Sequence, residues 1–133
     1  MAYVPMTAGG GSMSETTLWE NNAPTTAYVA TTVNLSGNIS DYEYIGFECR
    51  ESVNNDNRLT YYIKASDFPD CVAETNEPMP CLFTYQSTYY YCRLIQYDSD
   101  TTVAFARCYR GKPTGTWAGE NSALIPLRVV GLK

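Results

Sequence analysis

The chain has 133 residues, enough for one domain that buries its own core, and its 44% hydrophobic and 17% charged residues are typical of a folded, weakly charged protein. A net charge of −5 excludes the usual nucleic-acid-binding protein, whose surface is basic, and no apolar run approaches the ~18 residues that membrane insertion requires. The absence of histidine excludes Ser-His-Asp and Cys-His catalysis and histidine-rich zinc sites, so we expect no metal and no other cofactor.

The first 15 residues differ in composition from the rest. A flexible Gly-rich linker at residues 9–12 follows the apolar side chains of Tyr3, Val4 and Met6. Two interpretations are open: a frayed terminus, or an assembly arm that docks on a neighbouring subunit or a larger particle. The start has neither the basic residues nor the apolar core of a secretory signal, so we expect a protein of a reducing compartment.

From residue 16 onward, short runs rich in aromatic and β-branched residues alternate with turn residues, which is typical of strands. Residues 65–80 are predicted to be loop with one helical turn at 66–68, and Pro126 is expected at a sheet edge or bulge because it cannot donate to a ladder. The spacing predicts one all-β domain over residues 16–133, an antiparallel, jelly-roll-like β-sandwich. Eight strands are predicted, at residues 16–19, 28–35, 42–50, 58–64, 81–85, 89–97, 101–109 and 123–130.

A long hairpin over residues 89–109 is predicted to be central, with its turn at residues 98–100. In its second arm, strict alternation places Val103, Phe105 and Arg107 on one face. Small residues on the opposite face predict close approach of a second layer there. Those residues are Thr102, Ala104, Ala106 and Cys108.

Five cysteines carry no Cys-x-x-Cys motif, which argues against a zinc ribbon or a redox pair. Cys49, Cys92 and Cys108 fall in predicted strands and are expected to be buried thiols. Cys71 and Cys81 flank a Pro-rich loop, where they either pair or stay reduced.

Two pairs of carboxylates are candidates for a catalytic or metal-binding role. Asp98 and Asp100 stand in the predicted turn, and Asp67 and Asp70 in a loop. A glycosidase needs two carboxyls facing across a cleft, whereas turn-forming aspartate is far commoner, and the spacing lacks the glycine and distant glutamate of a calcium loop. We therefore predict no catalysis and no metal site.

Aromatic residues supply the candidate binding sites. Trp117 lies in a polar, Gly-rich loop, where it is either an exposed anchor for a sugar or protein partner, or folded back to plug one end of the sandwich. With Lys112, Glu120 and Tyr109 it forms the predicted ligand site, and Trp19 is expected in the core.

A row of tyrosines with an arginine among them forms a second candidate. It can be a binding stripe, an interface between subunits, or part of the interior with its hydroxyls satisfied. We interpret it chiefly as an interface. Its members are Tyr89, Tyr91, Arg93 and Tyr97.

Two segments resemble a known group of proteins. Residues 17–25, Thr-Leu-Trp-Glu-Asn-Asn-Ala-Pro-Thr, followed by Asp-Tyr-Glu-Tyr-Ile at 41–45, resemble the opening of small β-rich domains in tailed-bacteriophage and prophage structural proteins. Residues 124–133, Leu-Ile-Pro-Leu-Arg-Val-Val-Gly-Leu-Lys, resemble the ending of the same domains. The resemblance covers roughly residues 16–133.

Such domains form the tip of tail-fibre, baseplate or head-fibre proteins, often as trimers, and are thought to touch the host surface. The resemblance implies a virion protein, assembled in the host cytoplasm, that contacts other virion proteins and binds host-surface carbohydrate without catalysis. Because the chain starts with its own Met and a Gly-rich arm instead of a long fibre shaft, a capsid decoration or head-fibre protein anchored by that arm is the alternative. A polysaccharide depolymerase is a third, weaker possibility.

Overall fold

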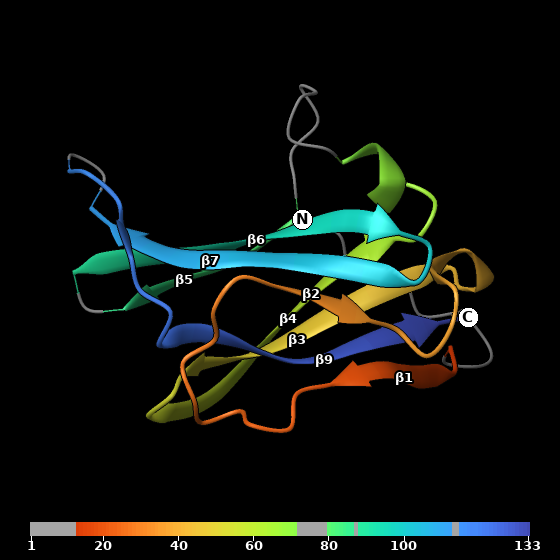
Figure 1. Ribbon diagram of the computed structural model, residues 1–133, viewed down its shortest axis with the longest axis horizontal. Coiled ribbons are helices and arrows are strands. Elements are labelled where there is room, and N and C mark those ends of the chain that lie inside the picture. Colours follow the sequence, from red (N-terminus) through yellow and green to blue (C-terminus); the bar gives the residue numbers. More distant parts are fainter. Residues whose placement is uncertain (1–12, 72–79, 87, 113–114) are drawn as a thin grey trace.

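The computed structural model describes residues 13–71, 80–86, 88–112 and 115–133. Two antiparallel sheets pack face to face, which confirms the predicted β-sandwich (Figure 1). The first sheet has the order β1-β9-β3-β4, and the second has the order β2-β7-β6-β5 with β8 added to β7. The elements are β1 (Glu15–Glu20), β2 (Thr31–Asn34), η1 (Ile39–Asp41), β3 (Tyr44–Ser52), β4 (Asn55–Lys64), η2 (Phe68–Asp70), β5 (Cys81–Gln86), β6 (Tyr89–Ser99), β7 (Thr102–Gly111), β8 (Ala118–Gly119) and β9 (Ala123–Leu132).

The predicted central hairpin is confirmed, since β6 pairs with β7, and β3 pairs with β4 in a second hairpin. The second predicted strand is shorter than expected, because β2 begins only at Thr31 and Val29 before it is 62% exposed. The predicted arm also ends earlier, since Ser14 pairs through its backbone with Lys133 and Glu15 opens β1. The arm residues Tyr3, Val4 and Met6 lie outside the described residues.

Aromatic rings fill the space between the sheets. Phe47 of the first sheet meets Phe105 of the second with ring centroids 6.2 Å apart, and Phe68 of η2 packs on Phe47 at 5.5 Å. Trp19 lies 5.7 Å from Phe105 and packs against the core, as predicted. Such edge-to-face and tilted contacts add to the free energy of burying the rings. Ile45, Phe47 and Cys49 alternate along β3 and form an inward row whose side chains are 0% exposed.

Pro126 lies beside a bulge in β9, as predicted. The pairing of β3 with β9 shifts register next to it, between the partners of Glu48 and Cys49. The Pro126 carbonyl accepts a hydrogen bond from the side chain of Asn21, which follows the end of β1. A proline is tolerated here because its missing N–H falls where the neighbouring strand has ended.

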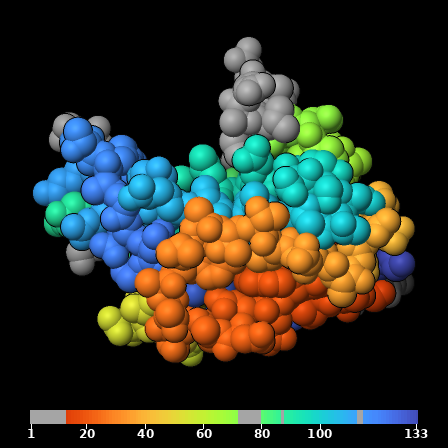
Figure 2. All heavy atoms as spheres, viewed as in Figure 1, coloured from red at the N-terminus to blue at the C-terminus, as the bar shows by residue number. Residues whose placement is uncertain are grey.

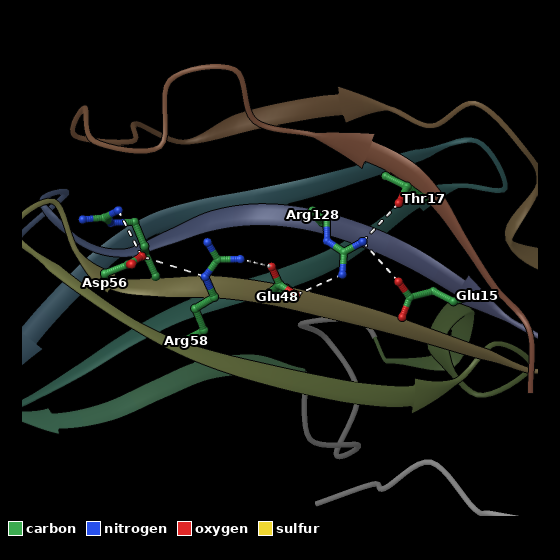
Figure 3. Close-up of polar contacts among 7 residues, drawn as sticks. Glu15, Thr17, Glu48, Asp56, Arg58 and Arg128 are labelled. Carbon is green, nitrogen blue, oxygen red and sulfur yellow. Dashed lines mark hydrogen bonds and ion pairs between the residues drawn. The ribbon is translucent and has the colours of Figure 1, made fainter. Parts of the chain in front are cut away.

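The outer face of the first sheet carries a ladder of ion pairs (Figure 3). Arg128 of β9 joins Glu15 of β1 and Glu48 of β3, each at 3.1 Å. The ladder continues through Arg58, 3.3 Å from Glu48, to Asp56 in β4. The ladder runs from well-exposed side chains, Asp56 at 72% and Arg58 at 60%, to the mostly shielded Glu48 at 15%.

Candidate functional site on the outer face of the second sheet

A β-bulge in β7 decides which side chains reach the outer face of the second sheet. Leu94 of β6 lies opposite two residues of β7, Ala106 and Arg107, instead of one. A bulge of this kind adds one residue to one strand and reverses the alternation beyond it. The pairs on either side of the bulge are Arg93 with Cys108 and Ile95 with Phe105.

This reversal corrects the predicted faces of the hairpin. Val103 and Phe105 share one face, as predicted, and it is the face toward the core, but Arg107 is exposed and Cys108 is buried. The small residues at positions 104 and 106 line the outer face, so the prediction that a second layer packs there is wrong. Strict period-two alternation failed because the extra residue cannot be seen in the composition of the strand.

Beyond the bulge, five aromatic side chains share the outer face of β5, β6, β7 and the segment leading into β8. The register aligns Gly111, Tyr90 and Tyr85 in one row, and Tyr109, Cys92 and Phe83 in the next. Side chains that are opposite in register and on one face lie within contact distance. We call this set the aromatic face, and its members are Phe83, Tyr85, Tyr90, Tyr109 and Trp117.

The aromatic face is open to solvent. Phe83 is 52% exposed, Tyr85 57% and Trp117 46%. Tyr90 links the first two, with ring centroids 5.6 Å from Phe83 and 4.8 Å from Tyr85. Contiguous exposed rings are uncommon on a solvated surface and mark sites of contact with a ligand or partner. The outer face of the first sheet differs, because the ladder of ion pairs crosses it.

Trp117 is held by a glycine beneath it. A Cβ placed on Gly111 would lie 2.6 Å from the indole ring, so the ring lies directly on the Gly111 backbone. The sequence left open whether Trp117 is exposed or plugs the sandwich; the structure places it on the outside, with its ring against Gly111. In Figure 2 the blue atoms of the connection from β7 to β9 lie at the left end of the molecule.

Arg107 lies beside the aromatic face in a defined position. Its guanidinium carbon is 4.9 Å from the centroid of the Tyr109 ring. The guanidinium also crosses the backbone of Gly119, which pairs with Tyr109, and a Cβ on that glycine would collide with it. Stacking on a ring leaves the edge of the guanidinium free to donate hydrogen bonds.

A groove of about 370 Å³ adjoins this cluster on the same outer face. Its floor is low because Ala104 and Ala106 carry only a methyl group, and Leu94 and Gln96 of β6 form one wall. The other wall is formed by β2, through Thr31 and Thr32, and by the residue before it. The groove therefore combines a flat apolar floor with hydroxyl and amide groups at its sides.

The bulge that exposes Arg107 is held from inside by Arg93. Arg93 is 0% exposed, and it donates hydrogen bonds to the carbonyl oxygens of Ala106 at 2.7 Å, Leu124 at 2.8 Å and Ala123 at 3.1 Å. Its guanidinium also lies 5.3 Å from the Tyr28 ring. Burial lowers the pKa of Arg93, but an arginine stays charged at any ordinary pH. Arg93 thus ties the bulge of β7 to the start of β9.

The position of Arg93 corrects the predicted interface. Its side chain is enclosed between the sheets and cannot contact a partner. Tyr91 and Tyr97 of the same row pack against the core, and only Tyr89 lies beyond it, under Arg110 at 4.8 Å and Lys112 at 5.4 Å. Of the three interpretations of this row, the interior one applies to the arginine and to two of the tyrosines.

The predicted ligand quartet is divided between two sides of the sheet. Trp117 and Tyr109 belong to the aromatic face. Lys112 lies over Tyr89, whose row faces the other sheet. Glu120 pairs with Arg110 at 3.7 Å and accepts a hydrogen bond from the hydroxyl of Ser122. Lys112 and Glu120 are therefore not part of the surface that carries Trp117.

The described cysteines are all reduced, so the predicted alternative of a Cys71–Cys81 disulfide is not present. Burial raises the pKa of Cys49 to about 12 and that of Cys108 to about 11. Cys92 is only half-buried, contrary to the prediction, and its thiol is hydrogen-bonded to Cys81 on the neighbouring strand. That hydrogen bond lowers the pKa of Cys81 and raises that of Cys92.

Of the two aspartates predicted in the turn of the central hairpin, Asp98 bonds within it, whereas Asp100 bonds to Ser40 of η1. Asp98 accepts a hydrogen bond from Thr102 at 2.7 Å, and Asp100 accepts two from Ser40, at 2.9 Å and 2.6 Å. Asp67 and Asp70 are joined through their backbones at η2. Within the described ranges, no three histidine, cysteine or acidic residues are grouped so as to hold a metal ion.

Several residues of the site were missed by the sequence analysis. Phe83 and Tyr85 alternate with Leu82 in β5, so a period-two analysis of that strand would have placed them on a shared face. Arg107 carried no such signal, because its exposure depends on the bulge.

No helix in the described part of the chain is both long and apolar enough to cross a membrane. Comparison with protein-family models and with curated proteins found no match for this sequence.

Proposed function

We propose that this chain is a non-enzymatic virion protein of a tailed bacteriophage that binds carbohydrate on the host surface through the aromatic face. The resemblance in residues 17–45 and 124–133 supports the virion role. The single observation that supports binding is the exposure of Trp117, Tyr109 and the rings of β5 on one rigid surface. Aromatic rings stack on the apolar faces of sugars, and a β-sheet holds them in place before the ligand arrives.

The experiment is binding of the purified protein to cells and isolated cell-wall glycans of candidate hosts. Replacing Trp117 with alanine should weaken binding by about 2 kcal/mol or more, roughly 30-fold, as for an anchor at the centre of an interface. Lys112→Ala is the matched control, since Lys112 lies on the other side of the sheet and should change binding by less than about 0.5 kcal/mol. Failure of the wild-type protein to bind any host surface would refute the proposal.

A second candidate role is favoured by the position of Phe83 and Tyr85. Both lie on β5, which pairs with β6 alone among the described strands, so their rings and the strand edge are available together. A capsid decoration or head-fibre protein could bury them between copies, as in a homotrimer. The mass of the protein in solution distinguishes the two roles: an oligomer that dissociates on Phe83→Ser and binds no glycan would favour this alternative.

A further inference from the structure

Arg107 differs from every other arginine of the chain in what it contacts. Arg50, Arg58, Arg110 and Arg128 each lie within 4 Å of a carboxylate, at 3.3, 3.3, 3.7 and 3.1 Å. Arg93 is buried on three carbonyl oxygens. Among the described residues, Arg107 has neither a carboxylate nor a carbonyl partner, although the chain has a net charge of −5.

The surroundings of Arg107 supply no compensating charge. From Tyr85 at one end to Gln96 at the other, the outward positions of β5, β6 and β7 contain no acidic residue. Glu120 follows β8 but pairs with Arg110 on the opposite side of the sheet. The guanidinium is therefore an isolated positive charge on an otherwise neutral, aromatic surface.

The guanidinium is also held in place before any ligand binds. The Tyr109 ring supports one side of it, and the bare backbone of Gly119 leaves the space that it occupies. Little side-chain entropy remains to be lost on binding, which favours affinity. A guanidinium held in this way presents paired donors that match the two oxygens of a carboxylate or phosphate.

From these observations we propose that the site binds an acidic glycan, with Arg107 bound to a carboxylate or phosphate of the saccharide. This inference rests on the proposed function and specifies its ligand. The sugar ring next to the anionic group stacks on Tyr109 or Trp117. The chain of the glycan continues along the groove over Ala104 and Ala106, where Gln96 and Thr32 are within its walls and offer hydrogen bonds.

The test uses the host cell-wall glycan that binds the wild-type protein most tightly. Its carboxylates are converted to alcohols by carbodiimide and borohydride in one sample, and its phosphodiesters are removed by hydrofluoric acid in another. We expect one of the two treatments to weaken wild-type binding by about 10- to 100-fold, the scale of a charge-assisted hydrogen bond. The treatment that does so identifies the source of the oxyanion.

Variants of Arg107 connect this loss to the residue. Arg107→Gln should bind the untreated glycan about 10- to 100-fold more weakly and should be insensitive to the treatment, while Arg107→Lys, which keeps the charge but not the paired donors, should lie between. Binding by the wild-type protein should also weaken with added salt more than binding by Arg107→Gln. The thermal unfolding temperature serves as the folding control, and substitution of the exposed Arg107 should leave it unchanged.

Failure of this inference is distinct from failure of the proposed function. If Arg107→Gln binds like the wild type while Trp117→Ala does not, the ligand is a neutral glycan at the same aromatic face and the inference is overturned. If the wild-type protein binds the glycan equally well after both chemical treatments, the inference is likewise overturned. If the wild-type protein binds no glycan, both the function and the inference fall.

Discussion

Nη1 of Arg93 donates a hydrogen bond to the carbonyl oxygen of Ala106 at 2.7 Å. A fully buried arginine therefore holds the bulge that exposes Arg107, the residue after Ala106. A bulge leaves backbone groups outside the ladder, and a buried carbonyl without a donor is costly. The buried Arg93 therefore stabilises the backbone conformation that places Arg107 on the outer face.

Arg93→Met should lower the free energy of unfolding by roughly 3–5 kcal/mol, because three carbonyl oxygens lose their donor at once. Urea denaturation of the two proteins measures the difference. Arg58→Met provides the comparison, since Arg58 forms exposed ion pairs worth at most about 1 kcal/mol. Equal effects of the two substitutions would contradict the role given to Arg93.

Gly111→Ala should displace the Trp117 ring from its seat without disturbing the core, because the added Cβ would lie 2.6 Å from the indole. We expect weaker glycan binding, close to that of Trp117→Ala, and a shift of tryptophan fluorescence. Gly115→Ala is the control, since its added Cβ would meet nothing nearer than 3.8 Å. If Gly111→Ala binds like the wild type, the packing of the Trp117 ring on Gly111 is not needed for binding.

Stability should fall at alkaline pH. Burial holds the pKa of Cys49 near 12 and that of Cys108 near 11, above the value of about 8.5 for an exposed thiol. The folded state then binds more protons than the unfolded state, so the thiols' contribution is complete below the unfolded pKa and is lost as pH rises through the folded values. Each thiol steepens the decline by up to about 1.4 kcal/mol per pH unit, from pH ~9 to its own folded pKa, which is about 11 for Cys108 and about 12 for Cys49.

Urea denaturation at a series of pH values from neutral to alkaline checks this slope. Cys49→Ala, compared with its own value at neutral pH, should show a shallower decline than the wild type. Tyr28 contributes in the same direction, because burial raises its pKa. An identical slope for the wild type and Cys49→Ala would show that the buried thiol does not control the transition.

Cys81 should be the thiol that alkylating reagents modify first. Its pKa is lowered by the hydrogen bond from Cys92, so more thiolate is present at neutral pH than for an ordinary cysteine. Mass spectrometry after brief treatment with iodoacetamide identifies the labelled residue. Cys92→Ala removes the donor and should move the labelling of Cys81 to higher pH. Equally rapid labelling of the buried Cys49 would contradict the arrangement.

The sequence predicted much of the fold because most of its strands alternate regularly. Ile45 and Phe47 in β3, and the turn at Asp98 and Asp100, follow directly from period and turn chemistry. The site was predicted only in part. Trp117 and Tyr109 were identified by residue type, but their neighbours were chosen by closeness in sequence, and Lys112 lies on the other side of the sheet.

Two positions were not predicted, for different physical reasons. Arg93 resembled a surface residue because charged side chains are seldom buried, and its partners are backbone carbonyls, which the sequence does not distinguish. Arg107 was predicted to share a face with Val103 and Phe105 because alternation was extended through the bulge. The bulge accounts for the second error, whereas the first depends on carbonyl groups that only the folded chain brings together.

The bulge makes the surface chemistry of this half of the sheet depend on strand register as well as on residue identity. A single substitution can remove Trp117 or Arg107, but it leaves the remaining outward positions as they are. If the same residues of β7 paired without the bulge, strict alternation would turn Tyr109 inward and Arg110 outward in one step. Losing one residue between Phe105 and Cys108 would remove the bulge but keep Tyr109 outward, so the recognition surface depends on the bulge only because β7 has one residue more than strict alternation needs.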